Sequence, residues 1–130
     1  MTFRIERKED LIEVQVWGNG DESEVLDILR KLREMAPRKE ISDLWFLSEE
    51  YVVPWAAFLP IVQELTRLLS EDMIAKKTAI VVASHLQMAQ GRLYLDEAKR
   101  LPFEIGVFMT REEAMKWLKT WSPTNIVRAT

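Results

Sequence analysis

Residues 43–69 read DLWFLSEEYVVPWAAFLPIVQELTRLL, and the rest of the chain is organised around them. Pro54 and Pro60 interrupt the charge-free run inside this stretch, where a helix should be starting. We predict a strand over 40–47 and a helix over about 54–70. Five aromatic side chains crowd the first half, so this part is either the buried centre of the fold or the lining of a pocket or contact surface.

Short alternating stretches precede this segment. Residues 3–6 and 12–16 alternate between apolar and polar with period two, on either side of a polar turn, which predicts a β-hairpin with one buried face. A helix should follow, capped by Asp21 with Glu24 as its capping-box partner and stopped by Pro37. Its predicted buried stripe is Val25, Ile28, Leu29, Leu32 and Met35.

The segments that follow repeat the strand and helix pattern. Residues 78–83 are apolar on both sides, which is typical of a central parallel strand covered by helices on both faces. Residues 103–109 predict the last strand, and Thr110 with Glu113 predicts a capping box for the final helix. Between these strands Ser84 can cap a helix, whose weaker apolar stripe consists of Leu86, Ala89, Leu93, Ala98 and Leu101.

The order of the predicted elements is ββαβαβαβα. A hairpin followed by alternating strands and helices implies a mostly parallel five-stranded sheet with one antiparallel edge strand and four helices. The chain has 130 residues and shows no internal repeat or linker. We therefore predict one α/β domain over 1–121 and a C-terminal tail over 122–130.

Composition argues against several classes of function. A net charge of −3 and scattered Lys and Arg residues argue against a nucleic-acid partner. The absence of cysteine excludes disulfides, thiolate metal sites and cysteine nucleophiles. No glycine-rich phosphate-binding pattern is present, so nothing supports a nucleotide site. The N-terminus lacks the apolar core of a signal peptide, and the longest uncharged run is too short to span a membrane, so we expect a cytoplasmic protein.

The element order resembles the STAS domain of anti-sigma-factor antagonists, specifically the SpoIIAA-like group of stand-alone bacterial proteins. The resemblance spans Phe3 to Trp121 and contains no catalytic signature. It implies a single-domain SpoIIAA-like fold. Its best local marks are Asp43-Leu44, closing the third strand, and Val107-Phe108, before a helix that carries Glu113-Ala114 and Trp117-Leu118.

The sequence departs from the antagonists at their phosphorylation site. In that family an Asp-Ser or Ser-Ser pair begins the second helix, and the matching positions here are about Tyr51, Val52 and Val53. Ser48 lies earlier, beside Glu49-Glu50, where a phosphate would meet like charge. The sequence therefore disfavours phosphoserine switching, and a partner-switching regulator stays as an alternative function.

What the resemblance implies instead is a module whose mobile second-helix region covers an apolar cavity. Such a module would bind a hydrophobic small molecule, a lipid or membrane surface, or a protein partner, and it could also form a homodimer. Parallel sheets bind ligands beyond the carboxyl ends of their strands, where the loop after Leu47 and Ser84-His85 are expected. We predict a non-catalytic binding module with no cofactor and no metal. Its candidate binding residues are Trp45, Ser48, Tyr51, Val52, Trp55, Phe58, Val62 and His85.

Each candidate also has a simpler explanation. Large aromatic residues often just fill the space between a helix and a sheet. His85, with Ser48 and Asp43, offers a second alternative, a small hydrolase with a nucleophile, a base and an orienting acid. No Gly-x-Ser-x-Gly pattern surrounds Ser48, and Asp43 is more simply a strand-end acid that accepts backbone hydrogen bonds. Glu49-Glu50 is more simply a solvated loop than a metal site.

Overall fold

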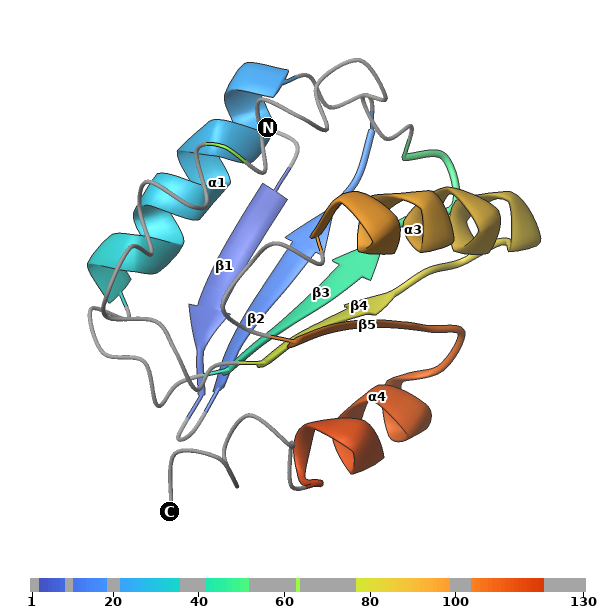
Figure 1. Ribbon diagram of the computed structural model, residues 1–130. Helices are drawn as coiled ribbons and strands as arrows, with labels where there is room; N and C mark the ends of the chain where they lie inside the picture. The colour runs from blue at the N-terminus through green and yellow to red at the C-terminus, as the bar shows by residue number, and fades with distance from the viewer. Residues whose placement is uncertain are drawn as a thin grey trace.

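The computed structural model describes residues 3–8, 11–18, 22–35, 42–51, 63, 77–98 and 104–120. Within this part of the chain, five strands form one sheet and three helices pack around it (Figure 1). The predicted second helix over 54–70 and the predicted tail over 122–130 lie outside the described residues. Gln63 is the exception, and it is helical. The count of four predicted helices therefore stays a prediction.

The sheet has the strand order β1-β2-β3-β4-β5. The edge strand β1 (Phe3–Arg7) pairs antiparallel with β2 (Leu11–Val16). The strands β3 (Ser42–Leu47), β4 (Lys77–Val81) and β5 (Glu104–Phe108) continue the sheet in parallel. This arrangement confirms the predicted mixed sheet with one antiparallel edge strand. Because β2 to β5 run in one direction, their carboxyl ends meet at one edge, called here the carboxyl edge.

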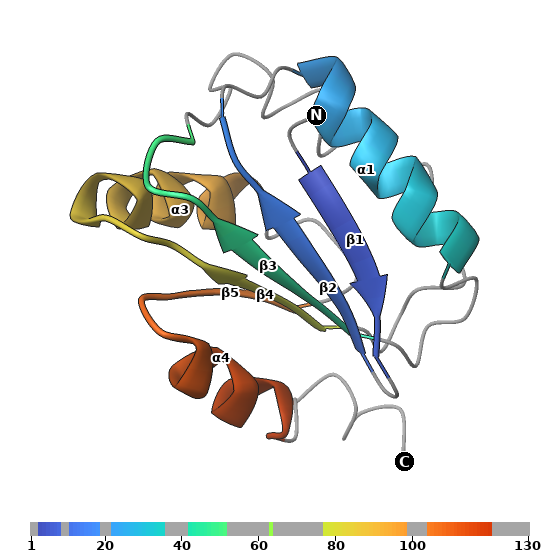
Figure 2. The same ribbon diagram turned by 180° about the vertical axis from the view of Figure 1, so that it is seen from behind.

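The helices cover opposite faces of the sheet. Helices α1 (Glu22–Met35) and α3 (His85–Ala98) lie on one face, and α4 (Arg111–Leu118) lies on the other, as the two views in Figure 1 and Figure 2 show. The sheet face under α1 and α3 is called the α1/α3 face. Burial along β2 agrees with helices on both faces of the sheet, since Leu11 to Val14 are buried whichever face they point to, and Gln15 is the one exposed residue of the strand.

The core on the α4 side is built from both helix and strand residues. Glycine at position 106 is required here, because a Cβ atom would lie 2.8 Å from the Phe108 ring and 3.3 Å from the Trp117 ring. Those two rings pack with their centroids 5.4 Å apart. The buried centre consists of Leu11, Leu44, Ala79 and Ala114, and Phe46, Val81, Phe108, Met115, Trp117 and Leu118 pack against it.

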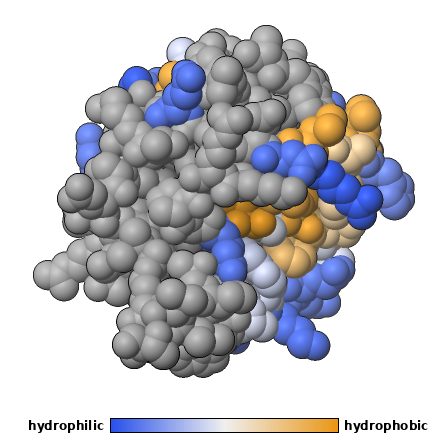
Figure 3. All heavy atoms as spheres, in the orientation of Figure 1, coloured by the Kyte–Doolittle hydropathy of each residue, from blue (hydrophilic) through white to orange (hydrophobic). Residues whose placement is uncertain are grey.

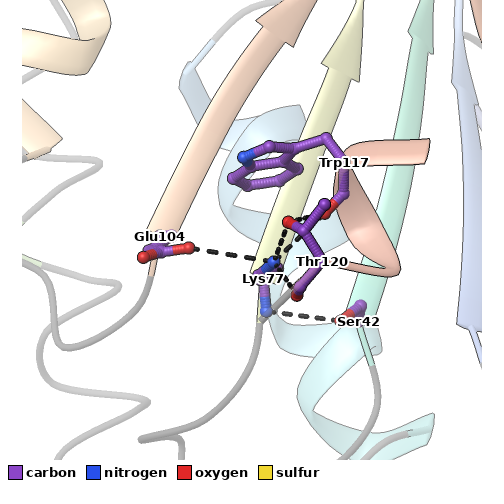
Figure 4. A network of polar contacts seen from close by, with 5 residues as sticks. All are labelled: Ser42, Lys77, Glu104, Trp117 and Thr120. Atoms are coloured by element: carbon purple, nitrogen blue, oxygen red, sulfur yellow. Dashed lines mark hydrogen bonds and ion pairs between the residues drawn. The ribbon is translucent and has the colours of Figure 1, made fainter. Parts of the chain in front are cut away.

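Side-chain hydrogen bonds hold both ends of α4. At its start, Thr110 Oγ1 accepts a hydrogen bond from the Glu113 N–H at 3.2 Å, which confirms the predicted cap. At its end, the buried Lys77 Nζ donates to the Trp117 carbonyl at 3.1 Å and to the Thr120 carbonyl at 2.5 Å (Figure 4). Glu104 Oε2 lies 4.0 Å from the same ammonium. Lys77 thus satisfies carbonyls that a helix C-terminus leaves without partners.

The orientation of α3 differs from the prediction. The described part of the predicted stripe faces solvent instead of the core: Leu86 is 69% and Leu93 57% exposed, and Ala89 is exposed as well. The helix packs on the sheet through Gln87 and Gly91, where a Cβ on Gly91 would lie 2.9 Å from Val107 Cγ1. The apolar spacing of the helix was right but its face was wrong, because a buried glutamine occupies the inner face and finds hydrogen-bond partners there.

Asp43 and Leu44, two of the residues that carry the resemblance, also occupy a different position in the third strand from the one predicted. Asp43 and Leu44 are the second and third residues of β3, which runs on to Leu47. They therefore open the third strand rather than close it. Asp43 is buried and pairs in register with Ile12 on one side and Thr78 on the other.

Candidate functional site at the carboxyl edge of the sheet

The chain leaves β3 through a tight turn that stays attached to β2. The Ser48 N–H donates to the Val16 carbonyl at 2.9 Å, which extends the β2–β3 pairing by one hydrogen bond. The Tyr51 N–H then donates to the Ser48 carbonyl at 3.1 Å and closes a four-residue turn around Glu49 and Glu50. Tyr51 is buried and is the last residue described before position 63. These contacts therefore hold the backbone in place up to Tyr51.

Gln87 joins this turn to the start of α3. Its side chain is 3% exposed, and its Nε2 donates to the carbonyls of Ser48 at 2.7 Å and Tyr51 at 3.1 Å. Its Oε1 accepts from the Ala83 N–H at 2.7 Å. One buried amide therefore satisfies backbone groups from two loops that follow neighbouring strands, as buried polar groups require.

The sequence carried a local signal for Gln87 that the prediction missed. Ser84 and Gln87 have the spacing of a capping box, and Ser84 Oγ accepts from the Gln87 N–H at 3.1 Å. This confirms Ser84 as the cap of α3. The reciprocal bond of an ordinary capping box is absent from the described contacts, because the Gln87 side chain reaches the neighbouring Ala83 N–H instead.

Glu50 carries a stabilised negative charge at the carboxyl edge. The pKa of its carboxyl group lies below its usual value, first because its own backbone N–H stabilises the carboxylate, and then because of the Ser48 hydroxyl. The backbone N–H of Gly18 adds to this effect, and Gly18 has a left-handed φ of 78° that places it there. The Ser48 hydroxyl is buried and lies near this carboxylate without a hydrogen bond of regular geometry among the described residues.

The α1/α3 face of the sheet is unevenly covered. Val14 and Val16 of β2 are buried, whereas the apolar residues that strands β3, β4 and β5 place on the same face are only half-buried. Register places these residues on one face, since Trp45 pairs with Val14 and Ile80, and Ile80 pairs with Val107. We call this half-buried set the apolar floor: Trp45, Leu47, Ile80, Ile105 and Val107.

The indole of Trp45 carries a buried hydrogen-bond donor. Its indole Nε1 is buried, and no hydrogen-bond partner for it lies within the part of the chain that the structure describes. Leaving a buried N–H without an acceptor costs about 1–3 kcal/mol. Such a group in a half-buried apolar setting is a feature of many small-molecule sites, where a few polar groups orient an otherwise apolar ligand.

The structure describes four of the eight predicted site residues. Ser48 and Tyr51 are brought together at the end of β3, and Trp45 lies on the apolar floor just before them. His85 is exposed at the first position of α3. The remaining four, Val52, Trp55, Phe58 and Val62, lie outside the described residues.

The catalytic arrangement considered for Ser48 is not assembled. Asp43 lies five residues before Ser48 along an extended strand, which separates the two by about 16 Å. The Ser48 hydroxyl has no regular hydrogen bond to His85 or to any other described residue. A nucleophile, a base and an orienting acid need to be linked by hydrogen bonds.

The described residues contain neither a cluster of metal ligands nor a membrane-spanning helix. None of their His, Asp and Glu side chains come together in a group of three that could hold a metal ion. Among the helices that the structure describes, none is long and apolar enough to cross a membrane.

Comparison with solved structures identifies the fold. A crystal structure of an uncharacterised DUF3478-family protein from Shewanella loihica PV-4, described as having a SpoIIAA-like fold, matches with a TM-score of 0.55. The match covers 89% of this chain and 91% of that chain. This chain has a SpoIIAA-like fold. The two sequences are 20% identical, so the likeness concerns the SpoIIAA-like arrangement of strands and helices. No protein-family model and no curated protein matches the sequence.

Proposed function

We propose that this SpoIIAA-like protein is a non-catalytic module that binds an apolar small molecule on the α1/α3 face. The molecule lies over the apolar floor and offers a hydrogen-bond acceptor to the indole N–H of Trp45. The buried Trp45 Nε1 without a partner among the described residues is the observation that carries the proposal. An acceptor on the ligand would remove the cost of that buried donor, which favours the bound state.

The incomplete burial of the floor supports the same position. Trp45, Ile80 and Val107 are half-buried in the middle of a sheet face whose β2 side is fully buried. Apolar side chains that a bound molecule removes from water contribute about 25 cal/mol for each square ångström buried. The binding free energy then comes from the floor, and Trp45 orients the ligand.

Gln87 gives the site a fixed border. It holds the carbonyl of Tyr51 at the point where the chain enters the segment predicted to form the second helix. In this proposal the predicted helix over 54–70 covers the bound molecule and contributes the predicted binding residues Trp55, Phe58 and Val62. The turn over residues 48–51, which Gln87 anchors, fixes where this predicted helix starts relative to the apolar floor.

Binding is better supported than the two alternatives. Hydrolysis lacks support because Asp43 lies at the far end of β3 and the Ser48 hydroxyl is not hydrogen-bonded to a described base. Partner switching through phosphorylation lacks support because that hydroxyl is buried next to the Glu50 carboxylate.

Calorimetric titration with two matched amphiphiles tests the proposal. Decanoate carries an acceptor, and decyltrimethylammonium has a chain of the same length with no acceptor. The wild type should bind decanoate more tightly, although its net charge of −3 favours the cation. Trp45→Phe keeps the apolar ring and should weaken decanoate binding about 3- to 10-fold, the loss of one hydrogen bond. Equal binding of both amphiphiles, unchanged in the variant, would contradict the proposal.

A further inference from the structure

Strand β1 has one side that no described strand pairs with, called here the open edge. It is the first strand in the order β1-β2-β3-β4-β5, so among the described strands it pairs with β2 alone. Figure 1 and Figure 2 both show it as the last strand on its side of the sheet. A strand in this position presents backbone N–H and C=O groups with which another strand can pair.

The hairpin shows which residues of β1 face the open edge. The Lys8 N–H donates to the Leu11 carbonyl at 2.8 Å, so the backbone groups of Lys8 point toward β2. Successive residues of an antiparallel strand point their backbone groups to opposite sides. The residues two and four positions earlier, Glu6 and Arg4, therefore point toward β2 as well. Ile5, the middle residue of β1, points its N–H and C=O groups to the open edge.

The side chains that flank Ile5 carry opposite charges. Arg4 and Glu6 are both exposed. They lie on the sheet face that carries α4, since Glu6 pairs in register with Glu13, whose carboxylate accepts a hydrogen bond from Arg111 of that helix. Within the described part of the chain, none of the ion pairs includes Arg4. The open edge thus presents an exposed base and an exposed acid on the two sides of one apolar residue.

Glu6 has one positive neighbour in the monomer. Lys8 Nζ lies 3.6 Å from Glu6 Oε2 and 3.4 Å from Glu13 Oε2, so two carboxylates that face each other in register share one ammonium. Like charges directly opposite each other on neighbouring strands are destabilising. A carboxylate accepts several hydrogen bonds, so a guanidinium that arrives from the open edge adds to Lys8 without displacing it.

We infer that β1 pairs with β1 of a second copy, antiparallel, about a two-fold axis at Ile5. The two Ile5 residues exchange their backbone hydrogen bonds, and the two five-stranded sheets become one continuous sheet. Arg4 of each copy then lies directly opposite Glu6 of the other. These positions form a pair without backbone hydrogen bonds, where side chains approach each other most closely.

Charge selects this register over the neighbouring ones. The direction of the backbone groups allows the second strand to shift by two residues. A shift in one direction places the two Arg4 side chains opposite each other, and a shift in the other direction does the same with the two Glu6 side chains. Only the register centred on Ile5 forms two pairs of opposite charge. Charges that protect the open edge against other strands thus match a second copy of this chain.

Charge reversal tests the pairing by sedimentation velocity. The interface is one five-residue strand from each copy, so we expect a weak dimer with a dissociation constant on the order of 100 μM. Arg4→Glu brings acids together and Glu6→Arg brings bases together, so each variant alone should dimerise about tenfold more weakly. An equimolar mixture of the two variants restores opposite charges at both pairs and should form a heterodimer.

Two variants on α4 are matched controls for this experiment. Lys116→Glu and Glu112→Arg make the same changes of charge at exposed positions outside β1, and each should dimerise like the wild type. A wild type that stays monomeric up to 1 mM, roughly tenfold above the expected constant, would overturn the inference. A mixture of the two β1 variants that associates no better than either variant alone would overturn it as well.

The outward side of α3 is a second apolar surface, and one further variant tests it separately. Leu86 and Leu93 are 69% and 57% exposed, and Figure 3 shows apolar atoms at the surface on the side of the molecule that carries α3 in Figure 1. Leu93→Glu places a charge on this surface and should leave the dimer unchanged. A dimer that Leu93→Glu dissociates and Arg4→Glu leaves intact would overturn the inference.

Amide hydrogen exchange locates the contact without a substitution. The Ile5 N–H points to the open edge, so pairing with a second copy should slow its exchange. Raising the concentration from roughly 20 μM to roughly 1 mM should slow it about fourfold, as the monomer fraction falls. The Glu112 N–H in the first turn of α4 is the reference and should keep its rate. An Ile5 rate that does not change, or equal slowing at both amides, would overturn the inference.

Discussion

The side-chain amide of Gln87 donates a hydrogen bond to the Ser48 carbonyl at 2.7 Å, across 39 positions of the sequence. The same amide also binds the Tyr51 carbonyl and the Ala83 N–H. The loops that follow β3 and β4 are thus held by one buried side chain. This contact explains both the position of the candidate site and the rotation of α3.

Replacing Gln87 should therefore destabilise the whole domain. In Gln87→Leu the part-buried carbonyl of Ser48, the buried carbonyl of Tyr51 and the N–H of Ala83 lose their partner, and we expect a loss of about 2–4 kcal/mol in the free energy of unfolding. Urea denaturation measures it. Gln15→Leu, at an exposed position of β2, is the control and should change stability by less than about 0.5 kcal/mol. Equal stability of the two variants would contradict this role for Gln87.

Lys77 should be needed for the end of α4. Lys77→Met keeps most of the buried stem but leaves the carbonyls of Trp117 and Thr120 without their donor. We expect a loss of about 2–3 kcal/mol, with faster hydrogen exchange in the last turn of α4. Lys116→Met, an exposed lysine on the same helix, should behave like the wild type in both measurements. Unchanged exchange in Lys77→Met would show that the ammonium does not cap the helix.

Glu50 should make stability depend on acidic pH. Its pKa in the folded protein lies below the usual value of 4.5, so the charged form is stabilised by folding. That contribution is fully present above the unfolded-state pKa and is lost as the pH falls through the lower folded-state pKa. The wild type should thus be more stable than Glu50→Gln at pH 7, and the difference should shrink below about pH 4.5.

Urea denaturation at pH 7 and pH 3 checks the Glu50 prediction. Glu49→Gln removes a neighbouring charge and is the control for a general effect of net charge. A stability difference between the wild type and Glu50→Gln that is independent of pH would contradict the assignment.

Local patterns were sufficient to predict most of the fold. Alternation with period two located β1 and β2, and the cap at Thr110 located the start of α4. These signals come from residues within a few positions of one another, so the sequence displays them directly. The strand order followed from the hairpin and the alternation of elements after it.

The candidate site depended on contacts that local patterns do not contain. The inner face of α3 is set by Gln87, whose partners Ser48 and Tyr51 lie 36–39 positions away. A helical period shows that leucines share one face of a helix. It does not show which face of the helix packs against a loop that is distant in the sequence. Trp45 was predicted as a binding residue for its ring, whereas its buried N–H became apparent only with its surroundings known.

The indole N–H resonance of Trp45 in a proton–nitrogen NMR spectrum tests the central proposal most directly, with Trp45→Phe to assign it. Addition of decanoate below its micelle concentration should move this resonance downfield with saturation, as a new hydrogen bond forms, while decyltrimethylammonium should not produce that shift. A Trp45 resonance that stays in place throughout the decanoate titration, while other indole signals move, would contradict the proposed site.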